Sequence, residues 1–221
     1  MPDDAPRRNP MRERFRDQVR DEVKDAALAQ LADGGPQAIS LNAIAKSLAV
    51  TGPALYRYFA GRDELLSTLI VDAYVDLRDA LAHDADAAPT ADRVERVSRL
   101  AYAYRNWALA QPHRYELLFK PPLPGYDAHA APLAEAARSL MGILLGALAE
   151  RAAPADEAKY TNDEVLEARS GGTQDFQNGV RTWSRLHGFV SLELGGAFAA
   201  MGLDADALFD AEVHALAPAV S

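Results

Sequence analysis

The side chains best suited to recognising nucleic acid are gathered between residues 39 and 59. Ser40 and Thr51 each precede a short run of helix-forming residues, and both side chains are suited to capping a helix N-terminus. Only Ala49-Val50 separates the two runs, and Pro53 falls in the first turn of the second, where its missing N–H costs nothing. Two short helices joined by so tight a turn project the second outward, where it can enter a major groove. The spacing therefore predicts a helix-turn-helix.

A second group of side chains could bind a small molecule. Trp183 and His187 are four residues apart and should share one helix face. Tyr104 and Trp107 share another helix, and apolar side chains on neighbouring helices complete the set. An apolar pocket with a few polar groups is typical of a ligand site, although plain core packing is the alternative interpretation. The predicted ligand-binding residues are Tyr104, Trp107, Phe119, Met141, Leu144, Trp183 and His187.

Catalytic chemistry has little support in the residue types. The chain has no cysteine, which excludes a thiolate nucleophile, a thiolate metal site and a disulfide framework. It has five histidines, none of which stands at metal-ligand spacing from another. Neither a glycine-rich phosphate loop nor a nucleophile elbow is present. We therefore expect no enzyme, no cofactor and no metal.

Helices must position these side chains, because apolar residues recur close to every 3.6 positions along most of the chain. The expected helices are Arg12–Ala32, Ser40–Leu48, Pro53–Phe59, Asp63–His83, Ala91–Ala110, His113–Phe119, Ala128–Ala152, Gln174–Met201 and Asp204–Ala217. Val50 is expected to be buried in the angle between the second and third of these. Polar residues 154–174 are predicted to form a long loop. The fold class is thus all-α, with about nine helices and no strand-like alternation.

Charge divides the chain into unlike parts. The 221 residues carry a formal net charge of −9. Residues 1–62 hold ten Lys/Arg and eight Asp/Glu, a balance of +2, which leaves −11 for the remainder. A weakly basic head on an acidic body suits a protein that presents one end to phosphate. We expect a flexible arm at 1–11, a DNA-binding domain at 12–62 and a helical ligand-binding and dimerisation domain at 63–221. The polar N-terminus and the lack of a long apolar run predict a cytoplasmic protein.

Between Arg12 and Ile70 the chain resembles the TetR family of bacterial repressors. The resemblance is densest in Ile44-Ala45, Val50-Thr51, Ala54-Leu-Tyr-Arg-Tyr-Phe59 and Arg62-Asp-Glu-Leu-Leu66. It implies a repressor whose third helix reads its operator as a dimer. The residues that it implies line the groove are Thr51, Gly52, Pro53, Ala54 and Tyr56. Those that it implies hold phosphates are Ser40, Tyr58 and Arg62, with Lys46 as a further contact. Sequence specificity is expected to depend on Thr51, Tyr56, Arg57 and DNA shape.

Two residues depart from the pattern of the family. The family usually has glycine where Ala49 stands, and a left-handed conformation there would cost alanine about 1 kcal/mol. The family usually has lysine where Arg62 stands; arginine keeps the charge and can grip a phosphate with two nitrogens.

The C-terminal half resembles a TetR subgroup whose ligand-binding region is named for its Trp, His and Gly spacing, here Trp183, His187 and Gly188. The segment Gln111-Pro-His-Arg-Tyr-Glu-Leu-Leu-Phe119 is similar to the short helix of that subgroup. The last two helices are apolar on more than one side, which favours pairing across a two-fold axis. The predicted dimer-interface residues are Phe189, Leu192, Phe198, Leu208, Phe209 and Val213.

Together these patterns predict a homodimeric repressor, released from a palindromic operator by a small hydrophobic or aromatic effector. Two alternatives stay open: a helical protein-interaction module and a small helical enzyme, each with a helix-turn-helix that is only structural.

Overall fold

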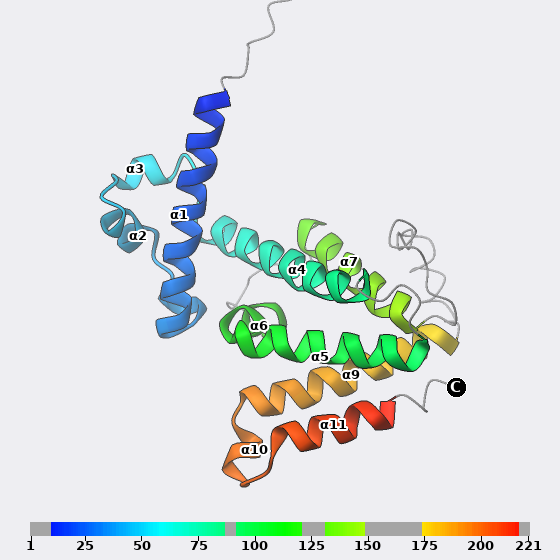
Figure 1. Cartoon of the computed structure of the whole chain (residues 1–221). Helices are drawn as coiled ribbons and strands as arrows, with labels where there is room; N and C mark the ends of the chain where they lie inside the picture. Colours follow the sequence, from blue (N-terminus) through cyan, green and yellow to red (C-terminus); the bar gives the residue numbers. More distant parts are fainter. Residues whose placement is uncertain (1–9, 87–91, 121–130, 149–173, 217–221) are drawn as a thin grey trace, which may run out of the picture. The chain divides into compact units, whose positions relative to one another are not determined.

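The computed structural model describes residues 10–86, 92–120, 131–148 and 174–216. These residues form helices and turns without a strand, so the predicted all-α class is confirmed (Figure 1). The N-terminal elements are α1 (Pro10–Gly34), η1 (Pro36–Ala38), α2 (Leu41–Ser47), α3 (Gly52–Leu55) and α4 (Arg62–Asp86). The remaining helices are α5 (Arg93–Ala110), α6 (Pro112–Phe119), α7 (Ala131–Leu148), α9 (Gln174–Leu194), α10 (Ala197–Ala200) and α11 (Ala205–Leu216).

The chain divides into two compact units, which share two of its helices. The first comprises the described parts of Met1–Ile70 and Glu116–Asp127, and the second those of Val71–Tyr115 and Ala128–Ser221. Helix α4 is continuous from Arg62, so its first residues belong to the first unit and the rest to the second. Helix α6 is divided in the same way after Tyr115.

The first unit packs α1, α2 and α3 around one apolar centre. Val23, Ala27 and Leu31 recur every four residues along α1 and are buried. Their partners are buried side chains from the other elements: Ile44, Ala45, Leu55, Phe59, Leu65, Leu66 and Leu69. Val50 was expected inside this centre and is instead 37% exposed. Its backbone N–H bonds to the Ala45 carbonyl at 2.9 Å and closes the end of α2.

Helix α3 is shorter than the pattern predicts. It ends at Leu55 rather than Phe59, and Tyr56, Arg57 and Tyr58 form a turn. The N–H of Tyr58 bonds to the carbonyl of Leu55 three residues earlier, at 2.9 Å. Three-residue bonds tighten the last turn of a helix. The tightened turn places Phe59 as well as Leu55 in the core.

The second unit is a helical body in which α5, α7 and α9 pack against one another and α11 packs against α5 and α9. Its core includes Val97, Ala101, Leu186, Val190 and Phe209. The single helix expected over 174–201 is wrong. Gly196 has a left-handed backbone (φ 75°), which ends α9 and starts the separate short helix α10.

Several sequence predictions fall outside the described residues, among them most of the N-terminal arm and the loop at 154–173. Within the described stretches, every helix is too short or too polar to span a membrane.

Candidate DNA-binding surface and effector site

The turn between α2 and α3 is built on Ala49. Its φ of 54° is the only positive value among the described non-glycine residues. The N–H of Ala49 bonds to the Lys46 carbonyl at 3.3 Å, and that of Val50 to the Ala45 carbonyl at 2.9 Å. These two bonds make a Schellman motif, in which the left-handed position is usually glycine. The left-handed conformation considered for Ala49 from the sequence is therefore present.

Hydrogen bonds at Ser40 fix the start of α2. The Ser40 hydroxyl accepts from the Ala43 N–H at 3.3 Å, which confirms the predicted cap. The Ser40 N–H donates to Gln30 Oε1 at 2.8 Å, which ties α2 to α1. Thr51 occupies the corresponding position before α3, but its side chain makes no capping bond. The entry to α3 is therefore held by Pro53 and by backbone bonds.

The predicted DNA-binding residues lie between residues 40 and 62 of the first unit, and more than half of their side chains are exposed to solvent. Ser40, Lys46, Thr51, Pro53, Tyr56 and Arg57 are exposed, and Gly52, Ala54, Tyr58 and Arg62 are half-buried. Tyr56 is 51% exposed directly after α3. Arg62 has a structural partner, because its Nη2 donates to the Pro36 carbonyl at 2.6 Å.

Arg20 is a residue that sequence reasoning missed. Its Nη1 donates to the Tyr58 carbonyl at 2.6 Å, and its guanidinium lies 4.3 Å from the centre of the Phe59 ring. This contact fixes α1 against the turn that follows α3. The signal in the sequence was an arginine on the same side of α1 as its apolar stripe.

In the second unit, three aromatic side chains meet around His187. Trp183 stacks on the imidazole with ring centres 5.5 Å apart, which confirms that the two share a face of α9. Tyr115 from α6 stacks on it at 5.6 Å, and its hydroxyl lies 2.8 Å from Nδ1. The Tyr104 hydroxyl from α5 lies 3.3 Å from the same nitrogen. We call Tyr104, Tyr115, Trp183 and His187 the His187 cluster; Tyr115 was not among the predicted site residues.

The His187 cluster is uncharged near neutral pH. Burial lowers the pKa of His187, so the neutral imidazole is favoured. Burial raises the pKa of Tyr115 to about 12. Burial, followed by the neighbouring Tyr115, also raises the pKa of Tyr104. A neutral Nδ1 can accept from a tyrosine hydroxyl, which leaves the ring proton on Nε2.

Trp107, one of the predicted ligand-binding residues, bonds to an acidic side chain on a neighbouring helix. Its Nε1–H donates to Asp76 Oδ2 at 2.9 Å, and Arg114 Nη1 pairs with the same oxygen at 2.9 Å. Asp76 is on α4, Trp107 on α5 and Arg114 on α6, so one carboxylate connects three helices. Trp107 is buried, and its indole N–H is held by the hydrogen bond to Asp76.

The other predicted ligand residues are less closely connected. Met141 is half-buried on α7. Phe119 belongs to the segment of α6 counted with the first unit, so it is not assigned to the His187 cluster. The side chain of Leu144 lies outside the described residues. One groove, of about 380 Å³, runs elsewhere on α9 and is lined by Asn178, Arg181, Thr182, Arg185 and Leu216 among others.

A charged cluster joins α5 to the end of α9 and the start of α11. Arg105 pairs with Glu193 at 2.5 Å and with Asp206 at 2.6 Å. The hydrogen bond with Glu193 raises the pKa of Arg105, which stays charged although nearly buried. Arg105 thereby connects three helices of the body.

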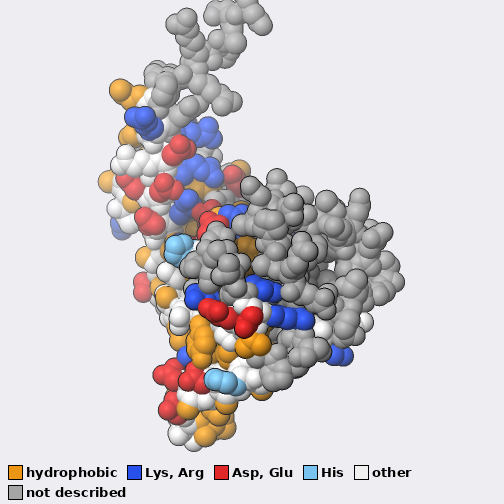
Figure 2. Space-filling view, turned by 45° about the vertical axis from the view of Figure 1, so that its right-hand side comes forward, with side chains coloured by type: hydrophobic (Ala, Val, Ile, Leu, Met, Phe, Trp, Pro, Cys, Tyr) orange, Lys and Arg blue, Asp and Glu red, His pale blue; other side chains and the backbone are white. Residues whose placement is uncertain are grey.

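Two predicted dimer-interface residues belong to the core of the chain. Phe209 and Val213 are 0% and 2% exposed, and Phe209 packs against Tyr102 and Phe189 with ring centres 5.5 and 5.1 Å apart. Their side chains are covered by their own protomer, so that assignment was wrong. Leu192 and Leu208 are exposed, and Phe189 and Phe198 are half-buried. Hydrophobic side chains are visible around α10, at the lower end of the second unit (Figure 2).

Comparisons with known proteins cover both units. Residues 24–69 match the family model described as bacterial regulatory proteins of the tetR family, and residues 97–216 match the tetracyclin repressor-like C-terminal domain. The HTH-type transcriptional regulator Rv1816 of Mycobacterium tuberculosis is 35% identical over 201 residues, covering 85% of this chain and 86% of the relative.

Solved structures show the same likeness. The crystal structure of the regulatory protein SCO4313 is 42% identical, with a TM-score of 0.75 and coverage of 92% of this chain and 97% of that one. The regulator FadR from Bacillus subtilis, solved with stearoyl-CoA, has a TM-score of 0.61 at 16% identity, covering 89% and 96% of the two chains, and shares the fold alone.

Proposed function

Because this chain belongs to the TetR family of transcriptional regulators, a DNA-binding family, we propose that it is a dimeric repressor released from its operator by a small hydrophobic or aromatic effector. The observation that supports DNA recognition most directly is the Schellman turn at Ala49. It holds α3 against α2 while leaving Thr51, Tyr56 and Arg57 exposed. Such side chains can bond to base edges and phosphates.

The roles proposed within this surface differ by exposure. Thr51, Gly52, Pro53, Ala54 and Tyr56 would face the major groove. Arg57, Lys46 and Ser40 would contact base edges or phosphates from the flanks of α3. Tyr58 and Arg62 are weaker candidates, because each is half-buried and Arg62 already bonds to Pro36.

To test this proposal, the purified protein selects a duplex from a randomised library, and the affinity of each variant for that duplex is then measured. Arg57→Ala should weaken binding by roughly tenfold or more, since a base contact is worth about 1–3 kcal/mol. Arg138→Ala, which removes an exposed arginine from α7 in the other unit, is the matched control and should bind like the wild type. Failure to select any duplex would overturn the repressor proposal in favour of a protein-interaction module.

The proposed effector site is the His187 cluster and the apolar side chains around it. Three helices converge on His187, and its ring is half-buried between Trp183 and Tyr115. The cluster carries no charge near neutral pH, which favours an effector with an aromatic or aliphatic body and a hydrogen-bonding group.

Thermal denaturation against a panel of aromatic and aliphatic compounds tests the effector proposal. Compounds that raise the melting temperature of the wild type should release DNA, because preferential binding to one state shifts the equilibrium. They should have a smaller effect on Trp183→Leu. Release of DNA by compounds that act equally on this variant would place the effector elsewhere.

We also propose that the exposed face of α9, with α11, forms the dimer. This face carries Leu192 and small residues, including Gly188, where an added Cβ would meet nothing within 4 Å. Leu208 on α11 and the half-buried Phe189 and Phe198 would extend it. Light scattering of Leu192→Glu should show dissociation, since the substitution would place a charge against an apolar partner. An unchanged dimer would remove this face from consideration.

A further inference from the structure

The first turns of α1 extend past the packed centre of the first unit. Val23 and Ala27 are buried, but the same four-residue spacing continues toward the N-terminus through Phe15 and Met11, which are 62% and 79% exposed. All described side chains from Met11 to Gln18 are exposed. The match to the family model begins at residue 24, after this extension.

Charges in this extension are sorted by face. Arg16, Arg20 and Lys24 recur every four residues, in register with position 12, and therefore form one basic stripe. Asp17, Asp21 and Asp25 recur in the same way, about 100° further round the helix. Arg14 lies about 160° from Arg16, beyond this acidic stripe. Because the two signs are separated, only one side of α1 is suited to phosphate.

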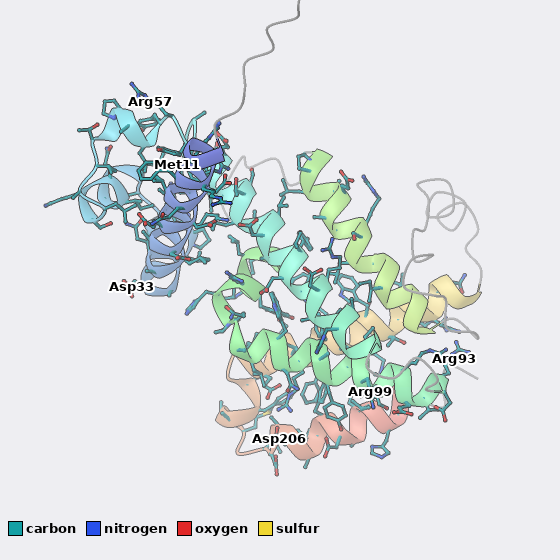
Figure 3. All side chains as sticks on the ribbon, turned by 45° about the horizontal axis from the view of Figure 1, so that its top comes forward. Met11, Asp33, Arg57, Arg93, Arg99 and Asp206 are labelled. Carbon is teal, nitrogen blue, oxygen red and sulfur yellow. The ribbon has the colours of Figure 1, made fainter. Side chains whose placement is uncertain are left out.

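The contact of Arg20 shows where the basic stripe points. Its guanidinium lies on Phe59 and bonds to the Tyr58 carbonyl, in the turn directly after α3. Arg16 is one turn, about 6 Å, closer to the N-terminus on the same face. Figure 3 shows Met11 and Arg57 at the same end of the unit, with Asp33 at the other, and Figure 1 shows the start of α1 at the end that carries α3. Arg16 therefore stands beside the proposed DNA surface.

Arg16 is available to bind a phosphate. Its side chain is exposed, and it has no ion pair or hydrogen bond to any described residue. Arg20, the next arginine of the stripe toward the C-terminus, is already bonded within the unit. An exposed arginine can bind a phosphate with two nitrogens.

We propose that the basic stripe of α1, through Arg16, binds the DNA backbone beside the bases read by α3. This inference rests on the proposed DNA-binding function and extends its surface beyond the helix-turn-helix. Such a contact adds affinity for any sequence and carries no base preference. In a dimer it would occur twice, once at each half of the operator.

The test compares Arg16→Gln with Arg14→Gln on the library-selected duplex and on a scrambled duplex of equal length. The two variants lose the same charge from the same helix, two residues apart. Arg16→Gln should weaken binding to both duplexes by about tenfold at low salt and make the plot of log K against log salt shallower by about 1.8. The ratio of the wild-type affinity to that of Arg16→Gln should therefore shrink about tenfold between roughly 50 and 200 mM salt. Arg14→Gln should behave like the wild type.

The outcomes separate this inference from the function on which it rests. Equal behaviour of Arg16→Gln and Arg14→Gln, with Arg57→Ala still impaired, would overturn the α1 contact and leave DNA reading by α3 intact. A loss confined to the selected duplex would also overturn it, since a backbone contact serves both. If the wild type binds neither duplex, the inference fails together with the proposed function. Thermal denaturation checks folding, which neither exposed arginine should affect.

Discussion

Replacing Ala49 by glycine should stabilise the DNA-binding unit without altering its geometry. Ala49 has a left-handed backbone at φ 54°, which costs an L-residue about 1–2 kcal/mol. Glycine removes this strain but gains freedom in the unfolded chain, which offsets about 0.4–1 kcal/mol. The expected net gain is about 0.5–1 kcal/mol. For a unit of this size, that gain corresponds to a rise in melting temperature of roughly 2–8 °C.

Ala43 provides the matched control for this substitution. It is exposed in α2 with a helical backbone, so Ala43→Gly should lose about 1 kcal/mol through helix propensity. Chemical denaturation followed by circular dichroism measures both changes. The two variants should shift the midpoint in opposite directions, while DNA affinity of Ala49→Gly stays unchanged. If Ala49→Gly destabilised the protein as Ala43→Gly does, backbone strain at the turn would be refuted.

Three further predictions concern the second unit. Arg105→Met should lower the free energy of unfolding by about 3 kcal/mol, because Glu193 is left nearly buried without its cation. Asp206→Asn should lower it by under about 1 kcal/mol, since Asp206 is exposed. Urea titration measures both, and equal losses would contradict the conclusion that the buried pair with Glu193 is the important one. Trp107→Phe should lower the free energy of unfolding by about 1 kcal/mol through loss of the bond to Asp76. Asp76→Asn should lower it further, because Arg114 also loses its partner. If Asp76→Asn left the stability unchanged, the connection of three helices through Asp76 would be contradicted. The pKa of His187 is lowered in the folded state, so the unfolded chain takes up the proton first as the pH drops below about 6.5. Stability should therefore fall below that pH and level off below the folded pKa. Thermal denaturation at a series of pH values should show a smaller dependence of stability on pH for His187→Gln than for the wild type.

Local patterns predicted much of the candidate site. The capping serine at Ser40 and the helix face shared by Trp183 and His187 follow from neighbours three or four residues away, and both are confirmed. The left-handed residue at Ala49 was indicated by the resemblance, because the family usually has glycine at that position. Local patterns predicted helix ends less well. Gly196 and the three-residue backbone bonds after Leu55 end two helices, although the apolar periodicity continues past both positions.

Partners distant in sequence were not predicted. Asp76 accepts from Trp107 and Arg114, and Arg105 pairs with Glu193 and Asp206, yet no periodicity relates these positions. Phe209 and Val213 were assigned to an interface because α11 is apolar on several sides. Composition cannot say which of these sides the protomer covers by itself.

The sequence by itself determined the helical class, the family and the two short helices around Ala49, because helix periodicity and capping act over a few residues. Tertiary structure decided which polar groups meet, which apolar faces stay exposed and where the arginines of α1 point. Those outcomes depend on how helices that lie far apart in the chain pack side by side, and short-range patterns carry no information about that packing.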